Sequence, residues 1–188
     1  INWSGDSKSM LVKVISSDKK PLINTSLIVP DGPTVSTNSG EKAQNRTYQD
    51  LLKNKSDEQN FEQLATSTIH KVYINGDSEK WLDDAMYRNI SFSPDGNYVM
   101  VTQIKKPFSY LVTYSRFPTK TDIYTMKGDL VTNVLDTPLI EELPKGFMAT
   151  TKGKRSFSWR SDKAATLIYV EALDGGDPAK KVDYRDEA

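Results

Sequence analysis

The sequence has no cysteine and only one histidine, His70, among its 188 residues. Without cysteine there can be no disulfide, no metal site built on thiolates and no thiol nucleophile. A Ser-His-Asp triad would have to use His70, which lies in a strand-like segment (67–74), and no G-x-S-x-G motif occurs. We therefore expect no catalytic residue, no metal and no cofactor within these residues.

The chain also lacks an excess of either charge and a long apolar run. Its 25 Lys and Arg residues balance 25 Asp and Glu residues. Proteins that bind nucleic acid normally carry a basic excess, so nucleic acid is not an expected partner. No apolar run approaches the roughly 20 residues that span a bilayer, so we expect no membrane contact. No signal peptide opens the chain, and its start at Ile1 indicates a processed or truncated polypeptide.

Short apolar runs rich in β-branched and aromatic residues predict buried strands, because turn-forming residues flank each run. These runs are 9–15, 98–104 and 166–172, and shorter strands are expected at 69–74, 109–115, 121–126 and 130–134. Residues 30–64 break the pattern, since a polar, glycine-containing stretch leads into a helical candidate over 47–64. We interpret 30–64 as an insertion with a short helix, which Thr47 could cap.

Three segments share an aromatic residue placed three positions before an aspartate, and a predicted strand follows each. The pairs are Trp3 and Asp6, Phe92 and Asp95, and Trp159 and Asp162. In the second segment, Ser-Pro-Asp-Gly suits a tight turn, because Pro fixes φ, Asp bonds nearby amides and Gly accepts a positive φ. Each segment is therefore expected to form a β-hairpin. Two further strands per hairpin would complete a four-stranded antiparallel blade of a β-propeller.

The repeats are separated by 89 and 67 residues, more than the roughly 40–50 residues of a propeller blade. We attribute the excess to the 30–64 insertion and to an extended hairpin that begins near residue 106. The chain would then hold about two blades and the start of a third. Because a closed propeller has roughly 4–8 blades, we predict an all-β partial propeller, with 1–188 as a fragment of it. The alternative is a set of unrelated hairpins that share a common turn.

Several long stretches resemble one enzyme family. They are 155–178 (RSFSWRSDKAATLIYVEALDGGDP), 46–54 with 30–33 upstream, and 107–112 with 116–118. These stretches are similar to prolyl-oligopeptidase-type serine peptidases of the glutamyl endopeptidase-like branch, although Ala164 stands where that family carries Pro. The resemblance implies a non-catalytic propeller that precedes an α/β-hydrolase domain and restricts access to its Ser, Asp and His. That catalytic domain is expected to lie outside 1–188.

The resemblance implies that this chain gates and orients peptide substrates within a secreted or periplasmic serine peptidase, without cleaving peptides itself. The alternative is a stand-alone, propeller-like module that binds proteins. In either case, residues 30–60 could act as a lid on which another protein docks. A hydrolase domain encoded downstream would favour the first interpretation, and a stop codon the second. Because isolated blades expose unpaired strand edges, we also expect self-association through those edges.

Arginine can pair with a carboxylate through two parallel hydrogen bonds. Arg88, Arg116 and Arg155 are therefore candidates for holding an acidic substrate side chain, and Lys152 and Lys154 accompany Arg155. The alternative for each is an ordinary solvated position.

Three acidic motifs remain. The pairs Asp83-Asp84 and Glu141-Glu142 could bind the amino terminus of a substrate, or could simply be solvated. The Asp-Gly-Gly-Asp-Pro motif at 174–178 lacks the ligand spacing of a calcium loop. We interpret it as a tight hairpin connection.

Overall fold

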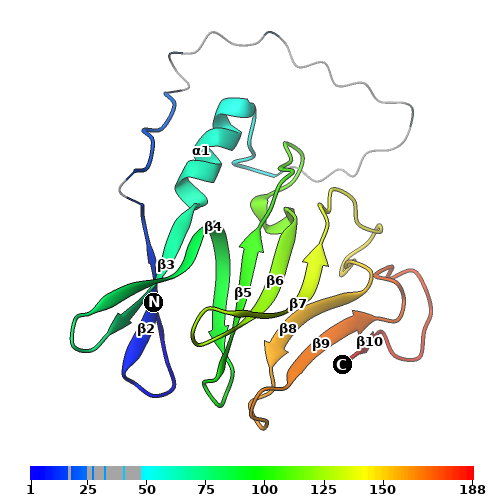
Figure 1. The fold of residues 1–188 in the computed structure, drawn as a ribbon. Coiled ribbons are helices and arrows are strands. Elements are labelled where there is room, and N and C mark those ends of the chain that lie inside the picture. The colour runs from blue at the N-terminus through cyan, green and yellow to red at the C-terminus, as the bar shows by residue number, and fades with distance from the viewer. Residues whose placement is uncertain (17, 25–26, 28–31, 33–39, 41–47) are drawn as a thin grey trace.

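The computed structural model describes residues 1–16, 18–24, 27, 32, 40 and 48–188, and these are mainly antiparallel β-structure (Figure 1). One sheet has the strands β1 (Asn2–Trp3), β2 (Ser9–Val14), β3 (Ser67–Tyr73), β4 (Ser78–Phe92), β5 (Tyr98–Ile104), β6 (Thr119–Thr125) and β7 (Leu130–Thr137) in sequence order. A second sheet has β8 (Lys154–Trp159), β9 (Leu167–Ala172) and β10 (Asp186–Glu187). The one described α-helix is α1 (Lys55–Ala65), and no described helix is long and apolar enough to cross a membrane. The expected all-β class is confirmed.

Strand β4 has 15 residues and takes part in two groups of strands. Its beginning pairs with β3, as Ser78 with Val72, and its end pairs with β5, as Phe92 with Val99. We call β1, β2, β3 and residues 78–82 the first half-sheet. Residues 86–92 with β5, β6 and β7 form the second half-sheet, and β8–β10 form the third sheet. The long sheet curls between its two halves (Figure 1).

The curl brings apolar faces of the two half-sheets together. Leu11 and Ile69 of the first half-sheet and Val99 and Val101 of the second belong to one core cluster, and each is at most 1% exposed. Removing this apolar surface from water favours the packed arrangement. Trp81, Tyr87 and Ile90 complete the buried part of the cluster.

The three repeated segments form β-hairpins, as the sequence predicts: β1–β2, β4–β5 and β8–β9. In each, the backbone N–H after the aromatic donates to a carbonyl at the start of the next strand, at 2.9 Å: Ser4 to Ser9, Ser93 to Tyr98 and Arg160 to Thr166. In the first two turns the serine hydroxyl also donates to the aspartate. The shared turn chemistry therefore produces the same local geometry three times.

Helix α1 covers a second core at one end of the long sheet. Its Phe61 ring packs edge-on against Phe108 and Phe117, with centroids 5.2 and 5.6 Å apart. The helix begins after Asn54, whose side chain accepts from the Asp57 N–H at 2.9 Å. It starts later than predicted, since Asp50 has a φ of 56° that a helix does not accommodate. The suggested cap, Thr47, lies outside the described residues.

The predicted strand at 109–115 is wrong. This segment contains instead an irregular connection with a short 3₁₀-helix at Tyr114–Arg116. Val112 and the flanking Phe108 and Phe117 are buried in the core beneath α1 rather than in a sheet, so the apolar character of this stretch predicted the wrong element. Conversely, the beginning of β4 was missed, because as an outer strand of the first half-sheet it is polar and largely exposed.

Substituting Leu11 by alanine tests the packing of the half-sheets. We expect Leu11→Ala to lower the free energy of unfolding by about 2–5 kcal/mol, because it leaves a cavity in the shared core. The measurement is urea denaturation followed by circular dichroism. Leu130→Ala is the matched control, since Leu130 is 56% exposed and its truncation should change stability by about 0.5 kcal/mol or less. Equal losses for the two variants would contradict the packing.

Candidate functional site

A cleft of about 870 Å³ separates the second half-sheet from the third sheet. Strands β5, β6 and β7 form one wall, with Met100, Thr102, Thr119, Thr121, Leu135 and Thr137. Residues 154–157 of β8 form the other, and the connection between β7 and β8 supplies the rim at 138–144 and 150–152. This volume is in the range of ligand sites, which are commonly about 300–1,000 Å³.

Two hydrogen bonds join the second half-sheet to the third sheet beside the cleft. At the turn end, the Trp159 indole N–H donates to the Ser91 carbonyl at 3.2 Å, and the Asp95 N–H donates to the Ala164 carbonyl at 3.0 Å. Toward the opposite end, the wall residues Thr102 and Thr119 do not supply a continuous apolar face. The sheets are therefore joined where the aromatic lies and open where the wall becomes polar.

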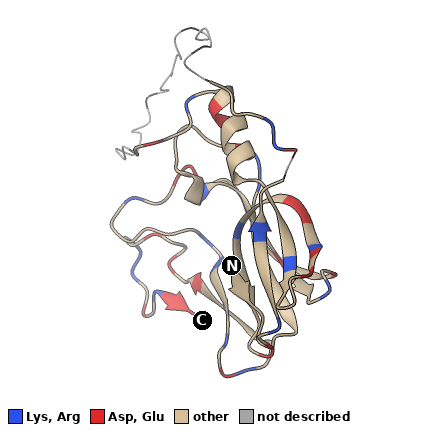
Figure 2. Cartoon of the chain, turned by 90° about the vertical axis from the view of Figure 1, so that its left-hand side faces the viewer, with Lys and Arg blue, Asp and Glu red and all other residues tan. Residues whose placement is uncertain are grey.

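The cleft carries charges of both signs. Arg88, Lys152 and Lys154 line it together with Asp136, Glu141 and Glu142. Figure 2 shows Lys and Arg interspersed with Asp and Glu along the strands and connections. A mixed lining of this kind can hold a zwitterionic or peptide-like ligand by pairing at two points.

Two of the three candidate arginines meet at this cleft. Arg155 pairs through Nη2 with Asp186 at 2.5 Å, while its Nη1 is buried without a hydrogen-bond partner among the described residues. Arg88 donates from Nη1 to the Ser115 carbonyl at 3.2 Å. Arg116 lies apart, with its guanidinium 5.5 Å from the centroid of the Tyr48 ring. The structure thus groups Arg88 with Arg155 but not with Arg116.

Of the two acidic pairs that the sequence offered, one lines the cleft and the other lies outside it. Glu141 and Glu142 line the cleft, and Glu141 accepts from the Ser109 hydroxyl at 2.6 Å. Asp83 lies elsewhere, paired with Lys80 at 2.6 Å, and its neighbour Asp84 accepts from Thr68. Only the Glu141-Glu142 pair is placed to meet a ligand in the cleft.

Among the described residues, His70 has a serine neighbour but no hydrogen-bonded carboxylate that would complete a triad. It lies on the first half-sheet, where its Nδ1 is 3.2 Å from the Ser78 hydroxyl. Among the residues that the structure describes, no three His, Asp or Glu side chains are grouped so that they could hold a metal ion.

The Asp-Gly-Gly-Asp-Pro motif supports the rim of the cleft. The 1%-exposed Asp174 accepts from Arg185 Nε at 2.7 Å and from the Gly176 N–H at 2.6 Å, and Arg185 also donates to the Met148 carbonyl at 2.6 Å. Gly176 has a φ of 82°, and a Cβ there would lie 2.1 Å from the Thr150 carbonyl oxygen. The motif is therefore not a tight hairpin connection, since the long loop 173–185 joins β9 to β10 and holds residues 148–150.

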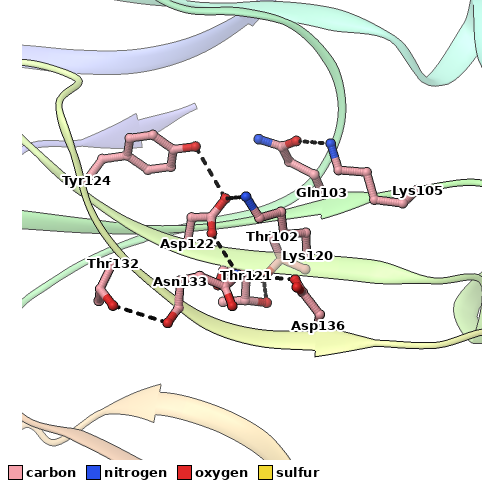
Figure 3. A network of polar contacts seen from close by, with 10 residues as sticks. All are labelled: Thr102, Gln103, Lys105, Lys120, Thr121, Asp122, Tyr124, Thr132, Asn133 and Asp136. Atoms are coloured by element: carbon pink, nitrogen blue, oxygen red, sulfur yellow. Dashed lines mark hydrogen bonds and ion pairs between the residues drawn. The ribbon is translucent and has the colours of Figure 1, made fainter.

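A buried polar network lies in the second half-sheet (Figure 3). Asp122, only 2% exposed, accepts from Asn133 Nδ2 at 2.8 Å and pairs with Lys120 Nζ at 3.2 Å. Asn133 also donates to Asp136 at 3.1 Å, which connects the network to the cleft lining. Paired and hydrogen-bonded in this way, the buried carboxylate fastens β6 to β7. Sequence reasoning missed Asp122, although an aspartate within an apolar strand is a recognisable signal.

Comparison with known proteins finds two curated relatives, both named "Probable glutamyl endopeptidase, chloroplastic". The protein from Oryza sativa subsp. japonica is 40% identical over 159 residues, which are 84% of this chain and 17% of the relative. The protein from Arabidopsis thaliana is 36% identical over 187 residues, 96% of this chain and 19% of the relative. The chain thus spans less than a fifth of each relative's length. No family model and no solved structure matches it.

Replacing Asp174 by asparagine tests the support of the cleft rim. The hydrogen bond from Arg185 lowers the pKa of Asp174 despite burial. A carboxyl whose pKa is lower in the folded than in the unfolded state stabilises the fold above its unfolded pKa, and this contribution disappears as pH falls through the folded pKa.

We therefore expect Asp174→Asn to destabilise the chain at pH 7, and the difference from the unsubstituted chain to be smaller at pH 3, because it declines as pH falls below the ordinary aspartate pKa of about 3.9. Urea denaturation at both pH values measures it, with the exposed Asp183→Asn as the control. A destabilisation that is the same at both pH values would contradict an ion-pair role.

Proposed function

We propose that the chain is a non-catalytic β-propeller portion of a glutamyl endopeptidase of the prolyl oligopeptidase type. In this role it gates and orients peptide substrates for a hydrolase domain that lies outside these residues. The observation that carries the proposal is the 36–40% identity, over most of the chain, to two proteins named as glutamyl endopeptidases. A periplasmic or secreted location is part of the proposal, and fractionation of the source cells would test it.

The sheet architecture supports the propeller part of the proposal. The first and second half-sheets each contain four antiparallel strands, and the third sheet contributes three more. Each sheet begins at one of the repeated hairpins, and β4 passes directly from the last position of one group to the first position of the next. Antiparallel four-stranded units in succession are the building plan of a propeller.

The connections support the assignment of one end as the functional end. Tight turns join the strands at one end, for example at Gly76, Gly96 and Gly128. Helix α1 and the long connections β5–β6 and β7–β8 lie at the opposite end (Figure 1). The cleft opens toward this end, and binding residues are commonly found on such loops. We propose that it faces the hydrolase domain.

The cleft chemistry supports a role for arginine in substrate orientation. Arg88 and Arg155 line a cleft that also holds Lys152 and Lys154, so a glutamate side chain would enter a site with several cations. The buried, unpaired Nη1 of Arg155 leaves a donor for a further acceptor. We propose that Arg88 and Arg155 help to hold the acidic side chain, whereas Arg116, packed on Tyr48, is the weaker candidate.

Peptide cleavage assays test the assignment of function. We expect the purified 188-residue chain to leave fluorogenic glutamyl peptides intact, since it is proposed to lack the catalytic domain. The complete polypeptide of the same open reading frame should cleave after Glu. Sustained cleavage by the short chain, unchanged in His70→Ala and after repurification, would overturn the proposal, as would an inactive complete polypeptide without a hydrolase domain.

Substitution of one cleft arginine tests substrate orientation in the complete polypeptide. Losing a charge-assisted hydrogen bond costs about 1.5 kcal/mol or more, so Arg88→Gln should raise KM for a glutamyl substrate about tenfold. The same variant should change KM for a glutaminyl analogue much less. Arg116→Gln is the matched control, and an equal effect of both substitutions would contradict a specific role for the cleft.

A further inference from the structure

We infer that a small cavity under helix α1 is a subsite for one large apolar side chain of the substrate peptide, next to the glutamate that the cleft holds. The inference deepens the proposed function and rests on it. We call this cavity the apolar subsite. Its lining consists of Arg88 and six apolar or aromatic residues: Phe61 and Ala65 of α1, Met86 and Tyr87 of β4, Ile104 of β5 and Tyr114 of the 3₁₀-helix.

The apolar subsite is closed on the side of the sheet and open on the side of the connections. Met86, Tyr87 and Ile104 are only 6–8% exposed. Phe61 is half-buried, whereas Tyr114 is 57% exposed. A side chain that enters beside Tyr114 would therefore meet buried apolar surface, and displacing water from that surface favours its binding.

The size of the apolar subsite suits a single side chain rather than a whole ligand. Its volume is about 280 Å³. Sites for whole ligands are commonly about 300–1,000 Å³, whereas an apolar cavity of about 150 Å³ already accepts a benzene ring. One phenylalanine or leucine side chain is therefore an occupant of suitable size.

The apolar subsite adjoins the cleft at Arg88, which lines both cavities. The Arg88 Nη1 donates to the Ser115 carbonyl at 3.2 Å, and Ser115 follows Tyr114 in the 3₁₀-helix. This hydrogen bond holds the guanidinium beside the apolar subsite. A peptide whose glutamate pairs with Arg88 in the cleft would therefore bring the side chain of a neighbouring residue to the apolar subsite.

A β-bulge places Arg88 at this junction. Tyr87 pairs with Gln103 and Asn89 pairs with Thr102, so Arg88 is an extra residue of β4 with no counterpart on β5. Bulges change the direction of a side chain and are common next to active sites. Here the extra residue lies where the two cavities meet, between Tyr87, which lines the apolar subsite, and Asn89, which lines the cleft.

The lining selects an apolar occupant. Among the described residues that line the apolar subsite, Arg88 alone carries a charge. The Tyr87 hydroxyl already donates to the Asp83 carbonyl. A polar side chain would lose its hydrogen bonds to water here without full replacement, which costs free energy. We therefore expect the complete enzyme to prefer a large apolar residue beside the glutamate.

Cleavage of three fluorogenic peptides by the complete polypeptide tests this preference. Each peptide has one glutamate: the first has alanine on both sides, the second has phenylalanine before it, and the third has phenylalanine after it. One phenylalanine peptide should exceed the alanine peptide at least about tenfold in kcat/KM, equivalent to 1.4 kcal/mol, and its identity shows which neighbour enters the subsite. Equal values for all three would overturn the inference, and would fit a cavity filled by another part of the polypeptide.

Substitutions show whether the preference comes from the apolar subsite. Ala65→Phe should fill the cavity and bring the ratio of the two kcat/KM values close to one. Leu64→Phe is the matched control, because Leu64 neighbours Ala65 on α1, does not line the cavity and is 64% exposed. Its ratio should stay at that of the unsubstituted enzyme. Equal ratios in the two variants would contradict the inference.

A second variant covers a failure of Ala65→Phe to fold, which circular dichroism would reveal. Tyr114→Ser removes one wall of the apolar subsite, and because Tyr114 is largely exposed we expect this variant to fold. It should lower the same ratio at least about threefold. An unchanged ratio in Tyr114→Ser would contradict the inference.

Calorimetry separates failure of this inference from failure of the proposed function, because it involves no cleavage. The 188-residue chain should bind the preferred phenylalanine peptide at least about ten times more tightly than the alanine peptide, and Ala65→Phe should remove the difference. Cleavage of glutamyl peptides by the complete polypeptide, without this difference in binding, would overturn the subsite alone. The difference in binding without any cleavage would support the subsite and overturn the proposed function.

Discussion

The packing of one sheet's apolar face on the next is the interaction on which the structure depends. Leu11 and Ile69 meet Val99 and Val101 between the half-sheets, and this contact bends the long sheet into two groups. Strand β4 can serve both groups because its pairing partner changes along its length. The hairpin turns keep the aromatic of each group at the same position, so the next sheet is placed against the previous one in the same way.

The cleft follows from where this packing stops. The third sheet is held to the second half-sheet near the turns by the indole of Trp159 and the amide of Asp95. Beyond them, the second half-sheet presents threonines such as Thr102 and Thr121 to the cleft, in place of the apolar face that Leu11 and Ile69 present between the half-sheets. The long connections and the charged side chains gather at the open end, where Asp174 and Arg185 fix the rim. Scaffold and candidate site thus occupy opposite ends of the same sheets.

The strands and turns that depend on local residue patterns could be predicted from the sequence. Strands β2, β5 and β9 were predicted from short runs of β-branched and aromatic residues flanked by turn formers. The three hairpins were predicted from an aromatic residue placed three positions before an aspartate. Sequence reasoning failed where contacts between distant segments determine the secondary structure. Residues 109–115 look like a strand but are buried under α1, whereas the polar start of β4 is a strand because β3 pairs with it. The cleft brings together Arg88 and Arg155, 67 positions apart in the sequence, and no local pattern could show which arginines would meet.

Exchange of the tryptophan indole protons with D₂O tests the central claim most directly. The chain has three tryptophans, so NMR of the ¹⁵N-labelled chain should give three indole signals, assigned by Trp→Phe substitution. The account predicts slow exchange for Trp159, whose indole N–H is bonded to Ser91 of the neighbouring sheet, as for Trp81, which is bonded to Met126. Exchange of Trp159 as fast as in free tryptophan would mean that the third sheet does not pack on the second half-sheet, and would contradict the account.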